Sequence, residues 1–92
     1  GHSCYMIQSG SARLLAIGDT LHVAPVQFPR PEITVAFDWD QPKARATRLS
    51  IFDTVVKESI PIAAVHLPFP GIGVLRKKGS EFVFDPAPWQ LF

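Results

Sequence analysis

The sequence has 92 residues, of which 47% are hydrophobic and 18% charged, enough apolar content for the core of one small domain. Nine basic and eight acidic residues give a net charge of +1, which provides no basic surface for a nucleic acid. The longest apolar runs, such as residues 62–65, are far shorter than the roughly 20 residues that cross a bilayer. We therefore expect a soluble domain whose partner is neither a nucleic acid nor a membrane.

The beginning of the sequence predicts that the chain is part of a longer protein and that further residues precede it. It opens with Gly1-His2-Ser3, without an initiator methionine or a visible signal peptide, and reaches an apolar stretch within a few residues. The single cysteine, Cys4, cannot form an internal disulfide, so no oxidising compartment is required. We expect Cys4 to be a small buried hydrophobic residue, and the compartment stays open.

Residues 5–8 and 13–17 predict two strands joined by a short turn. Gly10 in this turn supplies the positive φ angle that a tight hairpin requires. Because both runs are almost continuously apolar, we expect strands that are covered on both faces. The second run ends at Gly18-Asp19.

The segment 21–31 contains prolines at positions 25, 29 and 31, which argue against both a helix and a central strand. We expect a surface loop that is held down by its apolar side chains. Residues 32–37 alternate in polarity and predict a short strand.

Residues 41–57 predict the main helix. Asp38 or Asp40 can serve as its N-cap, and Pro42 is tolerated in the first turn. Charged residues lie mainly on the other faces, and one of them, Arg48, could pair with a carboxylate. The helix must end before Pro61. The predicted apolar face consists of Leu49, Phe52, Val55 and Val56.

The last third of the sequence predicts strands and turns. Residues 60–65 indicate a buried strand that leads to His66, and residues 67–73 indicate a stiff turn without a phosphate-binding pattern. Residues 74–77 and 81–84 predict a hairpin, followed by a tail, 85–92, that packs on its own domain. The fold class is α/β (α+β), mostly strands with one main helix and a C-terminal hairpin.

Three side chains near strand ends could carry chemistry. His2 comes just before the first strand, Asp19 follows the second, and His66 follows the strand at 60–65. Binding sites form at the carboxyl ends of strands, and imidazole with carboxylate suits zinc, manganese, iron or cobalt. The alternatives are a hydrogen-bonded histidine at a strand end, an aspartate that braces a turn, and a Gly-His remnant of tag removal.

The order of several motifs resembles a known family. The motifs are Gly1-His2-Ser3, Gly18-Asp19-Thr20, Ala46-Thr47-Arg48 and the run His66-Leu67-Pro68-Phe69-Pro70-Gly71-Ile72-Gly73. Together they resemble the C-terminal half of metallo-β-lactamase-fold hydrolases, in particular the branch with methyl parathion hydrolase and lactonase-like enzymes. The resemblance covers essentially the whole chain and implies that residues 1–92 form a single half-domain of an αββα sandwich.

The resemblance also implies a dinuclear metal site. His2 matches a ligand of the first metal, Asp19 matches the carboxylate that bridges both metals, and His66 matches a ligand of the second. In the family, a hydroxide held between the two ions attacks an ester, lactone, thioester or phosphotriester. The metals are zinc or another divalent ion such as manganese, iron or cobalt, and no catalytic residue beyond the ligands is implied.

The sequence departs from the family in its ligand count. The run His-x-His-x-Asp-His is absent, and the only other histidine is His22, which we expect to be structural or to support the ligands without binding metal. The chain alone should therefore bind metal weakly or not at all and should be inactive. We expect the fragment of a hydrolase. The alternative is a non-catalytic scaffold that self-associates or is complemented by an N-terminal half, with vestigial metal residues.

The substrate of the intact enzyme is expected to be a compact, fairly apolar, ester-like small molecule. Phe28, Leu67 and Phe69 are the candidates for its pocket. Plain packing is the alternative for these side chains, because aromatic residues beside prolines often serve the core.

Overall fold

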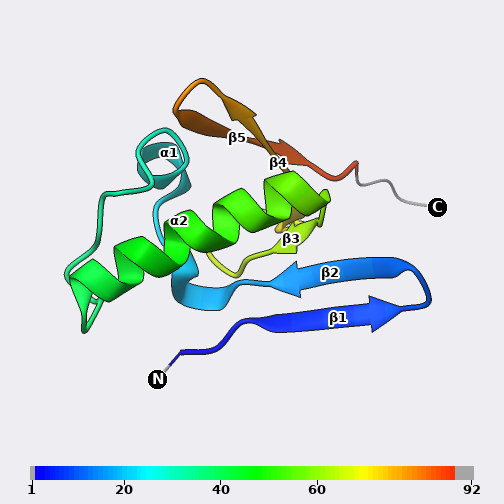
Figure 1. Ribbon diagram of the computed structural model, residues 1–92, viewed down its shortest axis with the longest axis horizontal. Helices are drawn as coiled ribbons and strands as arrows, with labels where there is room; N and C mark the ends of the chain where they lie inside the picture. Colours follow the sequence, from blue (N-terminus) through cyan, green and yellow to red (C-terminus); the bar gives the residue numbers. More distant parts are fainter. Residues whose placement is uncertain (1, 89–92) are drawn as a thin grey trace.

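The computed structural model describes residues 2–88, and its five strands form one mixed sheet (Figure 1). Strands lie side by side in the order in which they occur along the chain. They are β1 (Tyr5–Ser9), β2 (Ala12–Ala16), β3 (Ile62–Ala63), β4 (Ile72–Lys78) and β5 (Glu81–Pro86). Every neighbouring pair is antiparallel except β2 and β3, which are parallel. This sheet with its one main helix confirms the predicted fold class, half of an αββα sandwich.

The parallel pair β2–β3 determines where the rest of the chain must run. The amide of Leu15 donates to the carbonyl of Pro61 at 3.0 Å, and the amide of Ile17 donates to that of Ala63 at 2.9 Å. A parallel pair requires a crossover connection, and residues 17–61 supply it. Both strands therefore end at the same edge of the sheet.

The main helix, α2 (Gln41–Glu58), has the predicted boundaries to within one residue. Asp40 rather than Asp38 is its N-cap, because its side chain accepts a hydrogen bond from the amide of Lys43 at 3.0 Å. The helix ends at Glu58, and its C-cap residue, Ser59, has a left-handed conformation with φ of 54° that turns the chain away before Pro61.

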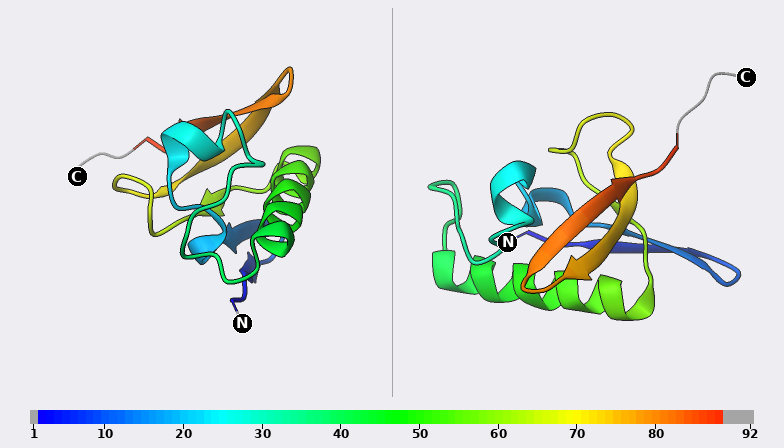
Figure 2. Two further views of the ribbon diagram at one scale, coloured as in Figure 1. Left: turned by 90° about the vertical axis from the view of Figure 1, so that its left-hand side faces the viewer. Right: turned by 90° about the horizontal axis from the view of Figure 1, so that it is seen from above.

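The core lies between α2 and one face of the sheet (Figure 2). Phe52 and Val55 of the predicted apolar face are fully buried, whereas Leu49 and Val56 are half-buried. The ring of Phe52 lies 5.5 Å from that of Phe28 and 5.2 Å from that of Phe82, between ring centroids. The buried apolar side chains are Ile17, Leu21, Phe28, Phe52, Val55, Ile60, Ile62, Ala64, Leu67, Leu75 and Phe82.

The crossover differs from the prediction in two places. One four-residue helix, α1 (Ala24–Gln27), forms within the proline-rich stretch, where Pro25 occupies the first turn and needs no N–H partner. The predicted strand at 32–37 is wrong, because these residues form turns and irregular backbone. Side chains satisfy the backbone there: the carbonyl of Ile33 accepts hydrogen bonds from Gln27 and Arg48.

Both strands of the first hairpin were predicted to be covered on both faces, and this is wrong: in β2 one residue is exposed and four are half-buried. All five residues of β1 are exposed, including Tyr5 at 68% and Ile7 at 55%. The strand pairs with β2 along one edge, and no part of residues 2–88 buries its side chains. Apolar composition alone could not distinguish a covered strand from an uncovered one.

The predicted strand at 60–65 is shorter in the structure. The chain leaves the sheet after Ala63, and Val65 is 76% exposed. The amide of Ala64 donates to the carbonyl of Gly71 at 2.9 Å, which closes the stiff turn predicted for residues 67–73. This turn places His66 just beyond the edge of the sheet.

The predicted C-terminal hairpin is confirmed as β4 and β5. Of the predicted tail, residues 85 and 86 extend β5, and residues 89–92 lie outside the described residues. None of the helices within residues 2–88 has the length and apolar character of a membrane span.

Phe52→Ala should lower the free energy of unfolding by about 3–5 kcal/mol, because the buried ring leaves a cavity between α2 and the sheet. Phe37→Ala is the matched control, since Phe37 is 87% exposed, and it should change stability by less than about 0.5 kcal/mol. Urea denaturation followed by circular dichroism measures both. Equal losses would contradict the placement of the core.

Candidate metal centre

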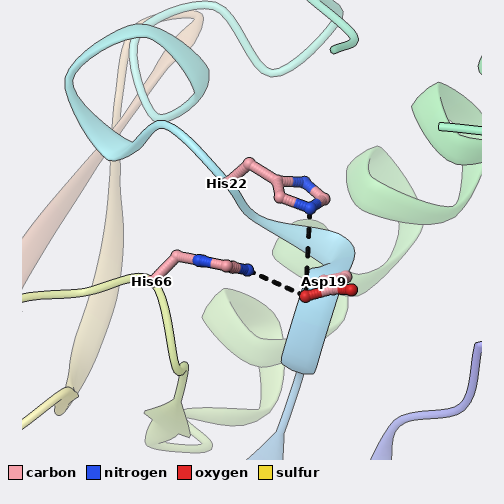
Figure 3. Close-up of side chains that lie close together, drawn as sticks. All are labelled: Asp19, His22 and His66. Carbon is pink, nitrogen blue, oxygen red and sulfur yellow. Dashed lines mark hydrogen bonds and ion pairs between the residues drawn. The ribbon is translucent and has the colours of Figure 1, made fainter. Parts of the chain in front are cut away.

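Asp19, His22 and His66 come together at the edge of the sheet where β2 and β3 end (Figure 3). Asp19 lies in a short 3₁₀ helix, Gly18–Thr20, directly after β2. His66 lies in the turn after β3, and His22 follows the 3₁₀ helix by two residues. Figure 3 shows both imidazole rings directed at the Asp19 carboxylate. Parallel pairing thus joins side chains that are distant in the sequence.

The contacts of this trio are short. The Nε2 atom of His66 lies 2.8 Å from Oδ1 of Asp19, and Nε2 of His22 lies 3.8 Å from the same oxygen. The two rings stack, with centroids 4.7 Å apart and planes inclined by 29°. One ligand atom from each residue lies within 4.8 Å of the other two.

His2 reaches the same neighbourhood but makes a different contact. Its Nε2 atom accepts a hydrogen bond from the backbone amide of Asp19 at 2.8 Å. This contact requires glycine at position 18: the φ angle of Gly18 is +50°, and a Cβ atom there would overlap the imidazole of His2. The contact therefore explains why glycine precedes Asp19 in the sequence. His2 itself lies outside the trio.

Electrostatics favour an ionised Asp19. The hydrogen bond from His66 is the largest influence that holds the pKa of Asp19 below its ordinary value. The charges of His22, His66 and His2 act in the same direction, and desolvation opposes them. The carboxylate is thus ready to act as a ligand.

The donor set of the trio fits one divalent transition metal. Two imidazole nitrogens and one carboxylate oxygen are the three protein ligands typical of catalytic zinc, which leaves one position open. Ligands at about 2.0–2.2 Å from a tetrahedral zinc lie roughly 3.4 Å from one another, so small side-chain shifts suffice. A second ion would need ligands beyond this trio.

A cavity of about 480 Å³ adjoins the trio. His2, Asp19 and His22 form part of its lining, together with Phe37 and Trp39. Both aromatic side chains are strongly exposed, and the ring of Phe37 lies 6.3 Å from that of His22, between centroids. Sequence reasoning missed this pair, although two aromatic residues flanking Asp38 before the helix were a usable signal.

The predicted pocket residues lie elsewhere. Phe28 belongs to the core, where its ring stacks on that of Phe84. For this residue the structure shows plain packing, the alternative to a role in the pocket. Leu67 and Phe69 line a second cavity of about 580 Å³, whose lining does not include the trio. Their predicted contact with substrate stays a prediction.

A buried arginine ties the segment around Asp19 to α2. The guanidinium of Arg48 is fully buried, and its Nε atom donates to the carbonyl of Thr20 at 2.7 Å. Its Nη1 atom donates to the carbonyls of Pro31 and Ile33 at 2.9 and 2.8 Å. Thr20 directly follows Asp19, so Arg48 fixes the backbone that carries the carboxylate.

Arg48 also forms the predicted pair with a carboxylate. Its Nη2 atom lies 3.5 Å from Oδ2 of Asp38. Burial lowers the pKa of the guanidinium and the Asp38 carboxylate opposes this shift, so Arg48 stays protonated. We expected Arg48 on a charged face, yet it lies four residues before Phe52 and seven before Val55, and this helical spacing placed it on the apolar face.

Gln27 of α1 supports His22 in a similar way. Its side chain is fully buried, and its Oε1 atom accepts from the amides of His22 and Val23 at 2.8 and 3.0 Å. A glutamine within an otherwise apolar stretch was the sequence signal for this support of His22.

Cys4 is half-buried rather than buried, and its Sγ atom lies 3.3 Å from the hydroxyl of Thr20.

Two solved structures are similar to the chain. One is AidC, a dizinc quorum-quenching lactonase in complex with the product N-hexanoyl-L-homoserine, with a TM-score of 0.88 and 27% identity over 94% of this chain. The other is the hydrolase AbOPH of the β-lactamase superfamily, with a TM-score of 0.91 and 37% identity over 98% of this chain. The chain spans only 29% and 31% of their lengths. Neither a protein-family model nor a curated protein matches.

Arg48→Met should lower the free energy of unfolding by about 3–5 kcal/mol, because three carbonyls and the Asp38 carboxylate lose a buried partner. Arg45→Met is the matched control on the same helix. Arg45 is exposed and makes one hydrogen bond, to the carbonyl of Glu32, so its loss should cost about 1 kcal/mol. Thermal and urea denaturation measure both, and indistinguishable variants would contradict the anchoring role.

Proposed function

This chain has the metallo-β-lactamase fold of the lactonase-like hydrolases, and we propose that it is the C-terminal part of a dinuclear metal-dependent enzyme that cleaves an ester, lactone or phosphotriester bond. The observation that carries the proposal is the contact between Asp19 and His66 at 2.8 Å, where two parallel strands end. A chain similar to a dizinc lactonase thus brings together a carboxylate and an imidazole from distant segments.

In the complete site, we assign His2 and His66 to one metal each and Asp19 to both. The run His-x-His-x-Asp-His is absent from this sequence, so the remaining ligands would come from another half of the protein. When bound, divalent metals such as zinc polarise the bond to be cleaved and lower the pKa of a water molecule toward neutrality. Without that other half, the chain should be inactive.

The residues of this chain position the Asp19 carboxylate and form part of the cavity beside it. Asp19 is held ionised, and Arg48 and Gln27 fix the backbone that follows it, at Thr20 and at His22. Phe37 and Trp39 give the neighbouring cavity an apolar part, which suits the apolar portion of a small ester-like molecule. Shielding from water at this wall would strengthen the interactions of the metal ligands.

A second candidate function, a self-associating or complemented scaffold, is supported by the exposed β1. Tyr5, Met6 and Ile7 are all exposed along an edge strand, which is a template for pairing with another chain. The apolar cavity of about 580 Å³ lies near this strand, since Tyr5 lines it. A complementary N-terminal half or a second copy of the chain would cover these groups.

The product of the complete gene should hydrolyse a lactone or aryl ester in a reaction that stops on chelation. Asp19→Ala and His66→Ala should each lower kcat/KM by at least about a hundredfold, because each removes a metal ligand. Asp53→Asn is the matched control: its carboxylate pairs with Lys77 on the surface, so activity should be retained.

Two results would contradict the proposal that this chain is an incomplete part of a hydrolase. One is a complete gene product, by intact mass, that begins near His2. The other is robust, chelator-sensitive turnover by the 92-residue chain alone, which would contradict its assignment as an incomplete part.

The isolated chain should form dimers or larger assemblies in light scattering coupled to size exclusion. Ile7→Lys places a charge on the exposed edge strand and should shift the chain toward monomer. Val26→Lys, at an exposed apolar position in α1, should leave the assembly unchanged. A monomeric wild-type chain at high concentration would rule out the self-associating form of the scaffold.

A further inference from the structure

We propose that this chain on its own binds one divalent transition-metal ion through Asp19, His22 and His66, with His22 as the third ligand in place of His2. The proposal concerns metal binding by the isolated chain and does not depend on hydrolysis. It revises the expectation of weak or absent binding, which rested on counting His22 as a supporting residue. That count gave each ion two ligands from this chain, Asp19 and one histidine. With His22 included, three donor atoms converge on one position.

The geometry selects these three side chains. The Nε2 atoms of His22 and His66 both face Oδ1 of Asp19, at 3.8 and 2.8 Å. All three donor atoms lie within 4.8 Å of one another. The ligand atoms of a tetrahedral zinc ion lie roughly 3.4 Å apart, so small side-chain movements would bring the donors to that separation. An ion between them would take the place of the proton that His66 shares with Asp19.

His2 is not among the three converging donors, and its Nε2 atom is already engaged in another contact. Its Nε2 lone pair accepts the amide hydrogen of Asp19 at 2.8 Å, and one nitrogen cannot accept this bond and bind an ion at the same time. Recruiting His2 would require breaking this hydrogen bond, whereas His22 needs only a small movement of its ring.

A second observation singles out His22. Its Nδ1 atom is buried and has no hydrogen-bond partner within residues 2–88, although buried polar atoms are almost always paired. The ring is nevertheless held inward, with a side-chain exposure of 16%, stacked on His66. No hydrogen bond at Nδ1 therefore holds this imidazole, and the ring is oriented by its stacking on His66, with Nε2 directed at Oδ1 of Asp19.

The backbone keeps the three donors close without the ion. Asp19 and His22 are only three residues apart in the chain, and the extended backbone at Leu21 after the 3₁₀ helix leads to His22, whose Nε2 atom lies 3.8 Å from Oδ1 of Asp19. Gln27 fixes the amide of His22, and the β2–β3 pairing fixes His66 relative to Asp19. A site that is already assembled loses little conformational entropy on binding.

The donor chemistry defines the class of ion. Two imidazoles and one carboxylate favour zinc, cobalt, nickel or copper over magnesium and calcium, which prefer oxygen ligands. With three protein ligands, at least one coordination position stays open for water or a small anion.

The test is a titration of the purified 92-residue chain with Co²⁺, followed by its visible absorption, and with Zn²⁺ in competition. We expect one ion per chain, bound through nitrogen and oxygen. His22→Gln should weaken binding by at least about tenfold and alter the cobalt spectrum, because a ligand is lost. His2→Gln should keep the affinity within about twofold of the unaltered chain and leave the cobalt spectrum unchanged. Asp53→Asn is the matched control for removal of a surface carboxylate.

A second measurement on the unaltered chain does not depend on how the variants fold. In the proton NMR spectrum of the Co²⁺-loaded chain, we expect the strongly shifted ring signals of two histidines, assigned to His22 and His66. Shifted signals from His2 in place of His22 would overturn the inference.

Other results would overturn it as well: no binding of Co²⁺ or Zn²⁺, two ions per chain, or a loss of affinity in His2→Gln with none in His22→Gln. The last result would leave the proposed hydrolase intact, because its assignment uses His2. Conversely, a complete gene product without hydrolytic activity would remove that proposal without affecting metal binding by the isolated chain.

Discussion

The parallel pairing of β2 and β3 is the constraint on which the other features depend. Hydrogen bonds from Leu15 to Pro61 and from Ile17 to Ala63 align the two strands in one direction, so both end at one edge of the sheet. An antiparallel arrangement would have placed His66 at the opposite edge from Asp19. The same pairing forces a crossover, which α2 uses to cover the core and to bring Arg48 beneath the segment that follows Asp19.

Elements defined by local signals could be predicted from the sequence. Helix α2 has a cap at Asp40, a proline in its first turn and an apolar stripe, and both hairpins have a glycine at the turn. Features that depend on distant partners could not be predicted. The exposure of β1, the short β3 and the irregular backbone at 32–37 are determined by what packs on or hydrogen-bonds to them, which no local pattern records.

The candidate site was predictable where it follows from topology and not where it follows from side-chain direction. Asp19 and His66 each follow a strand, and the rule for carboxyl ends placed them at one edge. The inward direction of His22 depends on the hydrogen bond from its amide to Gln27 and on the stacking of its ring on His66, neither of which composition reveals. The burial of Phe28 likewise depends on rings that come from α2 and β5.

The anchoring of the crossover has a consequence for how such a protein can diversify. Arg48 holds Thr20, Pro31 and Ile33 through their carbonyl oxygens, which every amino acid possesses. Replacing exposed side chains between Thr20 and α2 therefore leaves these three hydrogen bonds in place, whereas Gln27, Phe28 and Asp38 hold the loop through their own side chains. Mutation can remodel the cavity wall around Phe37 and Trp39 without displacing the Asp19 carboxylate. The scaffold thus allows the wall of the cavity to change while the candidate metal ligands keep their positions.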